Sequence, residues 1–362
     1  MKKFIVLFII AIFLISSCSK NSEKGQIELS KKYPMKMEMH KGVSGSTQSP
    51  RNSMPIGSTK GGGGIISVEK KPVFNTESYD RIYENKFLDA QEKPLSTFSI
   101  DVDTASYANI RRFLNRNSLP PKDAVRIEEM INYFTYNYDL PKQDRPFAVN
   151  VEVSECPWQG KHRLLRIGLK GKEIPTEQKP SSNLVFLLDV SGSMSSPNKL
   201  PLLKKAFKTL VENLNENDKI AIIVYAGASG MALAPTTCDQ KLTIFKALEK
   251  LRSGGSTNAG SGIQLAYDLA VKNFIQGGTN RVILATDGDF NVGITNRGDL
   301  IRLIEKKAKT GVFLSILGFG MGNYKDATLE KLANKGNGNY YYIDSFKEAR
   351  KVLVKEMGST LI

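Results

Sequence analysis

The sequence predicts an α/β protein with a doubly wound, mostly parallel sheet in its C-terminal half, preceded by a smaller α+β unit. From residue 181 to residue 362, short apolar runs alternate with longer amphipathic patterns. Parallel strands and their crossover helices follow one another in this order. Between residues 95 and 175 the order differs, because one strand pattern and two helical patterns come before two further strands. This segment is therefore expected to form a unit of its own.

The first 18 residues have the composition of an export signal. Met1-Lys2-Lys3 is basic, and the apolar run Phe4–Ile15 that follows is too short to span a membrane comfortably. The closing Ile15-Ser16-Ser17-Cys18 resembles a bacterial lipobox, which implies that Cys18 becomes the lipid-modified first residue. Multiple acyl chains anchor a protein stably, so we expect attachment to a membrane. An ordinary secretory signal with an incidental cysteine is the alternative.

A change in composition near residue 95 separates the next two segments. Residues 19–94, rich in Lys, Ser, Gly, Pro and Met, show little periodic apolar pattern and are expected to form a disordered tether. Residues 95–175 carry regular patterns and are expected to fold and to pack against the larger unit. The expected elements are a strand at 96–102, a helix carrying Tyr107, Ile110, Phe113 and Leu114, a second helix around 125–134, and strands near 147–153 and 163–169.

Two aspartates stand between the first strand and the first helix of this smaller unit. Asp101 and Asp103 could together hold a metal ion, but an aspartate pair before a helix is more often a turn followed by an N-cap. We therefore expect Asp103 or Thr104 to cap the helix.

The larger unit, residues 181–362, is long enough to bury a full core of its own. The strand expected at 231–234 follows its predecessor after a tight Gly-Ala-Ser-Gly turn, so it should be an antiparallel edge strand. The expected strands lie near 183–189, 219–226, 231–234, 281–286, 312–318 and 339–343. Helical patterns fill 199–214, 240–251, 259–274, 298–309, 325–335 and 345–358.

Charge and cysteine content restrict the partners. The formal net charge is +15, and removal of Lys2 and Lys3 with the signal would leave +13. This charge favours anionic lipid, polysaccharide or acidic protein, and an exported chain is not expected to bind nucleic acid. The lysines are spread along helices, which is typical of a solvated surface. Cys156 and Cys238 could pair in an oxidising compartment or remain two buried thiols.

The most informative stretch is Asp189-Val190-Ser191-Gly192-Ser193. It follows the apolar run 184–188, so its three polar side chains stand where a buried strand ends. Ligands bind at that edge of an open α/β sheet, and an oxygen-only donor set suits a hard cation such as Mg²⁺. The alternative is an ordinary turn with a helix cap. We expect Asp189 to face solvent at this strand end.

Two later segments complete a constellation. A glycine-rich turn, 254–258, places Thr257 before a helical pattern, and a second buried strand pattern, 282–286, ends at Asp287. The order Asp189, Ser191, Ser193, Thr257 and Asp287 resembles the metal-ion-dependent adhesion site of von Willebrand factor type A domains.

This resemblance implies a set of roles. The serines and the threonine would bind the metal directly or through water, and the aspartates mostly through coordinated waters. A sixth position would stay open for an acidic side chain of a protein partner. Mg²⁺ is the expected ion, with Mn²⁺ or Ca²⁺ as alternatives. Asp289 is expected to face solvent or to cap the loop rather than to bind the metal.

Longer sequence words extend the resemblance over most of the chain. STFSIDVDTASYANIRRFLN and VSECPWQGKHRLLRIGLKGKE resemble the N-terminal region of bacterial lipoproteins of the YfbK-like family, and DVSGSM, LATDGDFNVG and LGFGMGNYKD resemble its type A domain. Members of that family continue into a further C-terminal domain, whereas this sequence stops at Ile362. We therefore expect it to be a truncated or fragmentary chain.

The leading interpretation is a non-enzymatic, cation-dependent protein-binding module, lipid-anchored in the bacterial envelope and, in a Gram-negative cell, at the outer membrane. The alternatives are a metal-dependent hydrolase or phosphotransferase and a structural envelope protein with a stabilising metal. His40 and His162 lie far in sequence from the metal loops, so no general base is evident. The candidate rim residues are Met194, Ser195, Asn258, Phe290, Asn291, Met321 and Tyr324.

Overall fold

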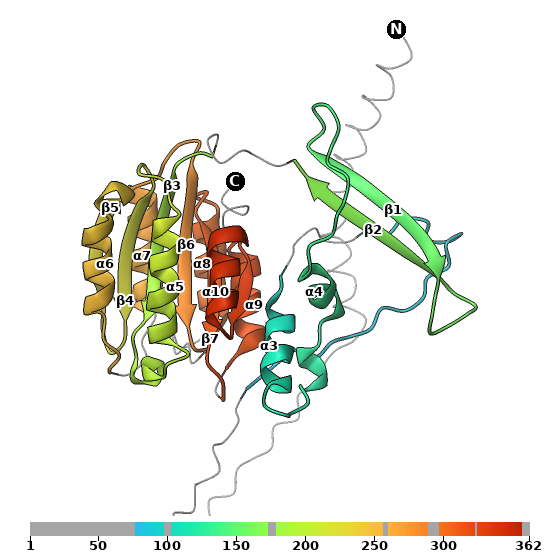
Figure 1. Cartoon of the computed structure of the whole chain (residues 1–362), viewed down its shortest axis with the longest axis horizontal. Helices are drawn as coiled ribbons and strands as arrows, with labels where there is room; N and C mark the ends of the chain where they lie inside the picture. Colours follow the sequence, from blue (N-terminus) through green and yellow to red (C-terminus); the bar gives the residue numbers. More distant parts are fainter. Residues whose placement is uncertain are drawn as a thin grey trace, which may run out of the picture. The chain divides into compact units, whose positions relative to one another are not determined.

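Six strands form the central sheet, in the order β5-β4-β3-β6-β7-β8 (Figure 1). All neighbouring pairs are parallel except β4 and β5, which are antiparallel. The fold class and the antiparallel edge strand are therefore confirmed. The strands are β3 (Ser182–Asp189), β4 (Lys219–Tyr225), β5 (Ser229–Thr237), β6 (Thr279–Thr286), β7 (Phe313–Phe319) and β8 (Tyr340–Ile343).

The computed structural model describes residues 77–97, 103–172, 179–255, 260–288, 297–322 and 324–356. They belong to one compact unit that spans residues 69–362. No helix in these ranges is both long and apolar enough to cross a membrane.

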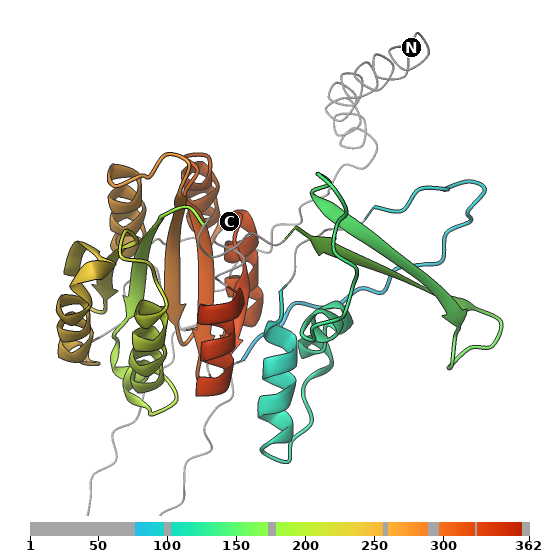
Figure 2. The same ribbon diagram turned by 45° about the horizontal axis from the view of Figure 1, so that its top comes forward.

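Helices cover both faces of the sheet (Figures 1 and 2). One face carries α5 (Leu200–Glu212), α6 (Lys241–Lys250) and α10 (Phe346–Arg350), which continues into a π-helical turn at Lys351–Glu356. The other face carries α7 (Gly260–Lys272), α8 (Arg297–Ala308) and α9 (Asp326–Lys335). Each expected helix of the larger unit is present, with ends that differ from the expected ones by a few residues.

The core lies in two layers because successive side chains of a buried strand point to opposite faces. All eight residues of β3 are buried. Phe186 packs on Phe207 of α5, with ring centroids 3.8 Å apart, whereas Leu187 faces α7. A Cβ atom at Gly262 of α7 would lie 3.0 Å from Leu187 Cδ1, so this glycine lets the helix approach the sheet closely.

The smaller unit contains helices α3 (Ala105–Leu114) and α4 (Ile127–Asn132), with a 3₁₀ turn at Lys122–Ala124 between them. The strands β1 (Phe147–Glu155) and β2 (Arg163–Gly171) pair with each other in an antiparallel sheet of their own. Ala105 and Ala108 of α3 pack in the same core layer as the β8 residues Tyr340 and Tyr342. The expected packing of this unit against the larger one is therefore confirmed for its first helix.

Arg111 and Arg126 of the smaller unit contact carboxylates of the larger unit, and Arg112 pairs with Glu77. We call these three arginines and their carboxylate partners the arginine seam. The Arg111 guanidinium lies 2.5 Å from Asp344 and 2.8 Å from Glu348. Arg112 donates to both carboxylate oxygens of Glu77, at 2.7 and 2.9 Å. Arg126 contacts Glu129 of α4 and, at 2.6 Å, Asp326 of α9. These contacts join segments that lie far apart in the sequence.

Two expectations for this region differ from the structure. Thr104 occupies the N-cap position of α3 but makes no side-chain cap bond. Asp103 precedes the N-cap position, and its Oδ1 accepts a bond from the Tyr340 backbone N–H at 2.8 Å, because β8 lies alongside. Glu77 and Ser78 were expected in the tether, yet Glu77 accepts the Gly322 N–H at 2.7 Å and Ser78 donates to the Tyr324 carbonyl at 3.0 Å. Asp101 lies outside the described residues.

Both cysteines in the described ranges are free and buried. Burial, with the nearby Asp218 carboxylate, raises the pKa of the Cys238 thiol to about 12. Of the two alternatives that the sequence left open for Cys156 and Cys238, the structure shows two buried thiols.

Candidate metal site

Two carboxylates meet where two adjacent parallel strands end. Asp189 is the last residue of β3, Asp287 follows the last residue of β6, and these strands are neighbours in the sheet. The Thr286 hydroxyl donates to Asp189 Oδ2 at 3.2 Å, and the Tyr225 hydroxyl from β4 lies 3.3 Å from the same oxygen. The side chain of Asp189 is thus held in place by groups from both neighbouring strands.

The loop after β3 folds back over Asp189. The Ser191 backbone N–H donates to Asp189 Oδ1 at 2.9 Å, and the Ser191 and Ser193 hydroxyls lie 3.0 Å apart. Backbone bonds join this loop to the one before α7, from Gly254 to the Val190 carbonyl at 2.7 Å and from Gly192 to the Gly255 carbonyl at 3.1 Å. These bonds place Gly254 and Gly255, which precede Thr257 in the sequence, beside the loop that carries the two serines. Thr257 itself lies outside the described residues.

The expectation that Asp189 faces solvent is wrong. Its side chain is fully buried, as is that of Asp287, and Ser191 is buried as well. Ser193 is exposed. Burial raises the pKa of Asp189, and the like charge of Asp287 adds to this, whereas hydrogen bonds from Ser191 and Thr286 act in the opposite direction. Two buried like charges so close together are costly without a compensating cation.

A lysine that the sequence analysis missed supplies such a cation. Lys199 immediately precedes α5, and its ammonium lies 2.8 Å from Asp287 Oδ2 and 3.1 Å from the Ser193 carbonyl oxygen. Its side chain is only 10% exposed. In the sequence it is one of 51 basic residues, and nothing in its spacing distinguishes it from the others. Only the fold brings it to the site.

The residues present fit a hard divalent cation. The side-chain donors that converge here are two carboxylates and two hydroxyls, and oxygen ligands of this kind suit Mg²⁺, Mn²⁺ and Ca²⁺. The ammonium of Lys199 is a positive charge beside these donors, 2.8 Å from the carboxylate of one of the expected ligands. The site is therefore built to hold positive charge beside Asp287.

Two of the expected rim residues are not at the surface. Met194 and Tyr324 are fully buried, because the 3₁₀ turn after β3 directs Met194 into the core and Tyr324 packs against Gly288. A Cβ atom at Gly288, which has φ +93°, would lie 2.9 Å from Tyr324 Cα. Ser195 is exposed and Met321 is half-buried. Asn258, Asp289, Phe290 and Asn291 lie outside the described residues.

A small pocket adjoins the site on the side of α3. It has a volume of about 280 Å³, and its lining includes Asn198 and Met321, the sequence neighbours of Lys199 and Gly320. Asn115 and Arg116, at the end of α3, also line it. The smaller unit thus contributes to the surface beside the candidate metal site, which the sequence analysis did not anticipate.

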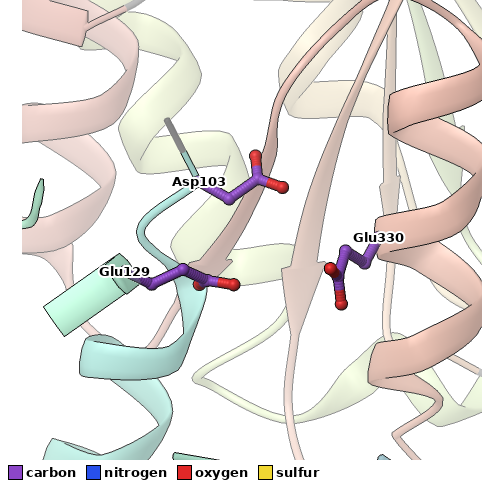
Figure 3. A group of neighbouring side chains, drawn as sticks. All are labelled: Asp103, Glu129 and Glu330. Atoms are coloured by element: carbon purple, nitrogen blue, oxygen red, sulfur yellow. The ribbon is translucent and has the colours of Figure 1, made fainter. Parts of the chain in front are cut away.

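A second group of carboxylates lies beside Arg126 of the arginine seam. Oxygens of Asp103, Glu129 and Glu330 come within 4.8 Å of one another and converge on a common space (Figure 3). Arg126 contacts Glu129 and lies 3.7 Å from Glu330. Burial and neighbouring carboxylates raise the pKa of Glu330 to about 7, against the opposing effect of Arg126. The guanidinium already supplies the positive charge of this group, so we assign it a structural role.

Comparison with known proteins agrees with this fold. Residues 183–355 match the family model of the von Willebrand factor type A domain, and residues 73–166 match a second model described as von Willebrand factor. Residues 183–355 of the chain therefore belong to the von Willebrand factor type A domain family.

Within that family the chain is similar to YfbK of Escherichia coli strain K12, with 46% identity over 294 residues, or 79% of this chain and 51% of YfbK. It is 28% identical to the protein sll0103 of Synechocystis over 52% of this chain and 43% of that protein. It is 30% identical to human inter-alpha-trypsin inhibitor heavy chain H3 over 45% of this chain and 19% of that protein. The chain thus spans about half the length of YfbK and less of the other two.

Solved structures also resemble it. BatB from Bacteroides thetaiotaomicron is 21% identical, with a TM-score of 0.42 over 49% of this chain and 98% of that chain. Proximal thread matrix protein 1 from the mussel byssus, with a zinc-occupied MIDAS motif, is 21% identical, with a TM-score of 0.40 over 51% of this chain and 46% of that chain.

Proposed function

We propose that the chain is a divalent-cation-dependent protein-binding module of the bacterial envelope, attached to a membrane by lipid at Cys18. Its metal site would consist of Asp189, Ser191, Ser193, Thr257 and Asp287, and its partner would be a protein that offers an acidic side chain. The observation that carries the proposal is the meeting of two buried carboxylates and a pair of hydroxyls at the C-terminal edge of the sheet, with a cation already on one carboxylate.

The chain's own residues supply an ordered site. Asp189 is fixed by the backbone of Ser191 and by the hydroxyls of Thr286 and Tyr225, so little ordering is left for binding to achieve. The hydroxyls of Ser191 and Ser193 contact each other and can turn their oxygens toward an ion. When bound, a cation such as Mg²⁺ would hold and polarise an incoming carboxylate.

Binding is favoured over hydrolysis by the composition of the site. His162, the histidine within the described residues, lies between β1 and β2 with its ring 5.0 Å from that of Phe87. No imidazole therefore stands beside Asp189 or Asp287 in the part of the chain that the structure describes. An enzyme working near neutral pH needs a general base with a suitable pKa, and a binding module does not.

The metal assignment is tested by titrating Mg²⁺ and Mn²⁺ into the full chain and into Asp189→Ala by calorimetry. We expect one ion to bind to the wild type and none to the variant, because the best-ordered carboxylate is gone. The matched control is Asp268→Ala, which removes an exposed carboxylate on α7 that contacts Lys307. Equal binding by Asp189→Ala and the wild type would refute the site. Unfolding of Asp189→Ala would instead favour a metal with a purely structural role.

The lipid anchor is tested separately with Cys18→Ser in cells. We expect the precursor to remain uncleaved or the protein to leave the membrane fraction, because the acylated residue is lost. Fractionation and immunoblotting measure this, with Cys238→Ser as a control that removes a buried thiol of the domain. Normal processing and unchanged membrane association of Cys18→Ser would contradict the proposed anchoring.

A further inference from the structure

We propose that Lys199 is a built-in counter-ion that makes the metal and the acidic ligand of this site bind cooperatively. The inference rests on the proposed metal-dependent binding function and concerns a residue outside the expected ligand set. In this role Lys199 weakens the binding of the metal alone and strengthens the binding of a carboxylate once the metal is present.

The position of the ammonium is determined by the fold. The Lys199 backbone N–H donates to the Ser196 carbonyl at 2.9 Å, and its own carbonyl accepts from Leu203 at 2.8 Å, which fixes the start of α5. The stem then crosses Gly320, where a Cβ atom would lie 2.2 Å from Lys199 Cε. A Cβ atom at position 320 would displace the end of the Lys199 side chain, and Gly320 has φ +77°, a conformation that favours glycine. The ammonium arrives between Asp287 and the Ser193 carbonyl.

Burial distinguishes Lys199 from the surface lysines. Its side chain is 10% exposed and its partner Asp287 is fully buried, whereas Lys208 on the same helix is 39% exposed and pairs with an exposed glutamate. Charges in contact interact strongly when solvent is largely excluded, and weakly when they are exposed. Solvent therefore screens the charge of Lys199 only weakly at Asp287. The same holds for its repulsion of a metal ion bound beside Asp287.

A count of charges gives the direction of the effect. Asp189, Asp287 and Lys199 together carry −1, so a divalent ion brings the site to +1, and a ligand carboxylate then brings it to neutrality. Without Lys199 the same states would carry −2, 0 and −1. With Lys199 present, the site that holds the ion alone carries a net charge of +1, which disfavours that state. The site that holds both the ion and an acidic ligand is neutral. A site of this kind retains its metal mainly when a partner is bound.

The test compares Lys199→Met with the wild type by Mg²⁺ calorimetry on the full chain, with and without acetate, at ionic strength matched by chloride. We expect Lys199→Met to bind Mg²⁺ alone at least about tenfold more tightly, because a buried positive charge near the ion is removed. We also expect acetate to strengthen Mg²⁺ binding by the wild type more than by the variant. Lys246→Met, an exposed lysine on α6, should behave like the wild type.

The outcomes separate this inference from the proposed function. If the wild type and both variants bind no Mg²⁺, the metal-site proposal fails. If all bind Mg²⁺ and Lys199→Met binds it no more tightly than the wild type, the counter-ion proposal fails alone. A purely structural ion pair would lower the melting temperature of Lys199→Met equally with and without Mg²⁺, whereas a counter-ion predicts a larger Mg²⁺-induced rise in the variant. If Lys199→Met does not fold, Lys199→Gln, which keeps a donor to Asp287 without the charge, is compared in the same way.

Discussion

Two groups of buried carboxylates within the described residues are compensated differently. In the arginine seam, Arg126 reaches Glu129 with one guanidinium nitrogen and Asp326 with another. At the sheet edge, Asp189 accepts hydrogen bonds from hydroxyls and a backbone N–H, and Asp287 accepts one from the ammonium of Lys199. The seam joins two units of the chain, whereas the sheet edge joins only neighbouring strands and their loops.

The difference shows how the compensating group decides what a buried carboxylate can do. A guanidinium presents several donors in a rigid plane and occupies the carboxylates permanently. A hydroxyl can donate to a neighbour in one state and present its oxygen to a cation in another. The carboxylates of the seam are therefore committed to structure, and those of the sheet edge remain available to a ligand.

The strongest test of this comparison is Arg126→Met, which leaves the seam carboxylates without their cation. Breaking a buried pair by removing one partner costs about 3 to 5 kcal/mol, and we expect a loss of this size in the free energy of unfolding measured by urea denaturation. Mg²⁺ or Ca²⁺ should not restore the stability. Arg302→Met is the control, since Arg302 and Asp299 are exposed neighbours on α8 and should contribute about 0.5 kcal/mol or less. Equal losses in the two variants would remove the distinction between seam and surface.

A smaller effect is expected in the pH dependence of stability, through Glu330 beside Arg126 of the seam. The folded-state pKa of Glu330 is raised from 4.5 to about 7, so the folded protein binds this proton more tightly than the unfolded chain does. Stability contributed by this group is therefore present below pH 4.5 and is lost as the pH rises through about 7. Glu330→Gln should match the wild type at about pH 4.5 and be more stable by about 1 to 3 kcal/mol above pH 7.

Chemical denaturation across this pH range measures the difference for Glu330→Gln. Glu305→Gln is the control, because Glu305 is an exposed carboxylate on α8 that pairs with Lys335. Its effect should vary little with pH. A Glu330→Gln variant that is less stable than the wild type at high pH would show that the seam needs the charge of this residue.

The fold was predictable because its signals are local. The five parallel strands are short apolar runs that lie between amphipathic helices, and each was placed from its own residues. Asp189 and Asp287 were also predictable as neighbours, because both stand at the carboxyl ends of such runs. The burial of Asp189 was not, since it depends on the loops that fold over the strand end.

Long-range electrostatic contacts left no signal in the sequence. Arg126 and Asp326 are 200 residues apart, and neither has a spacing that indicates the other. Lys199 stands 88 residues from Asp287, and its role depends on a glycine in a third loop. The assignments of Thr257 and Cys18 lie outside the described residues and stay predictions.

The attachment of Glu77 has a mechanical consequence. Glu77 and Ser78, the first of the described residues, contact the loop 320–325 through Gly322 and Tyr324. Tyr324 lies against Gly288, the residue after Asp287. If the chain is tethered at Cys18 as proposed, tension passing along the backbone would reach Glu77 and Ser78 before the other described residues. A partner that pulls on the metal site would apply force to the same few residues from the opposite direction. Force between the lipid anchor and the bound partner would then pass through the short stretch of contacts from Glu77 to Asp287.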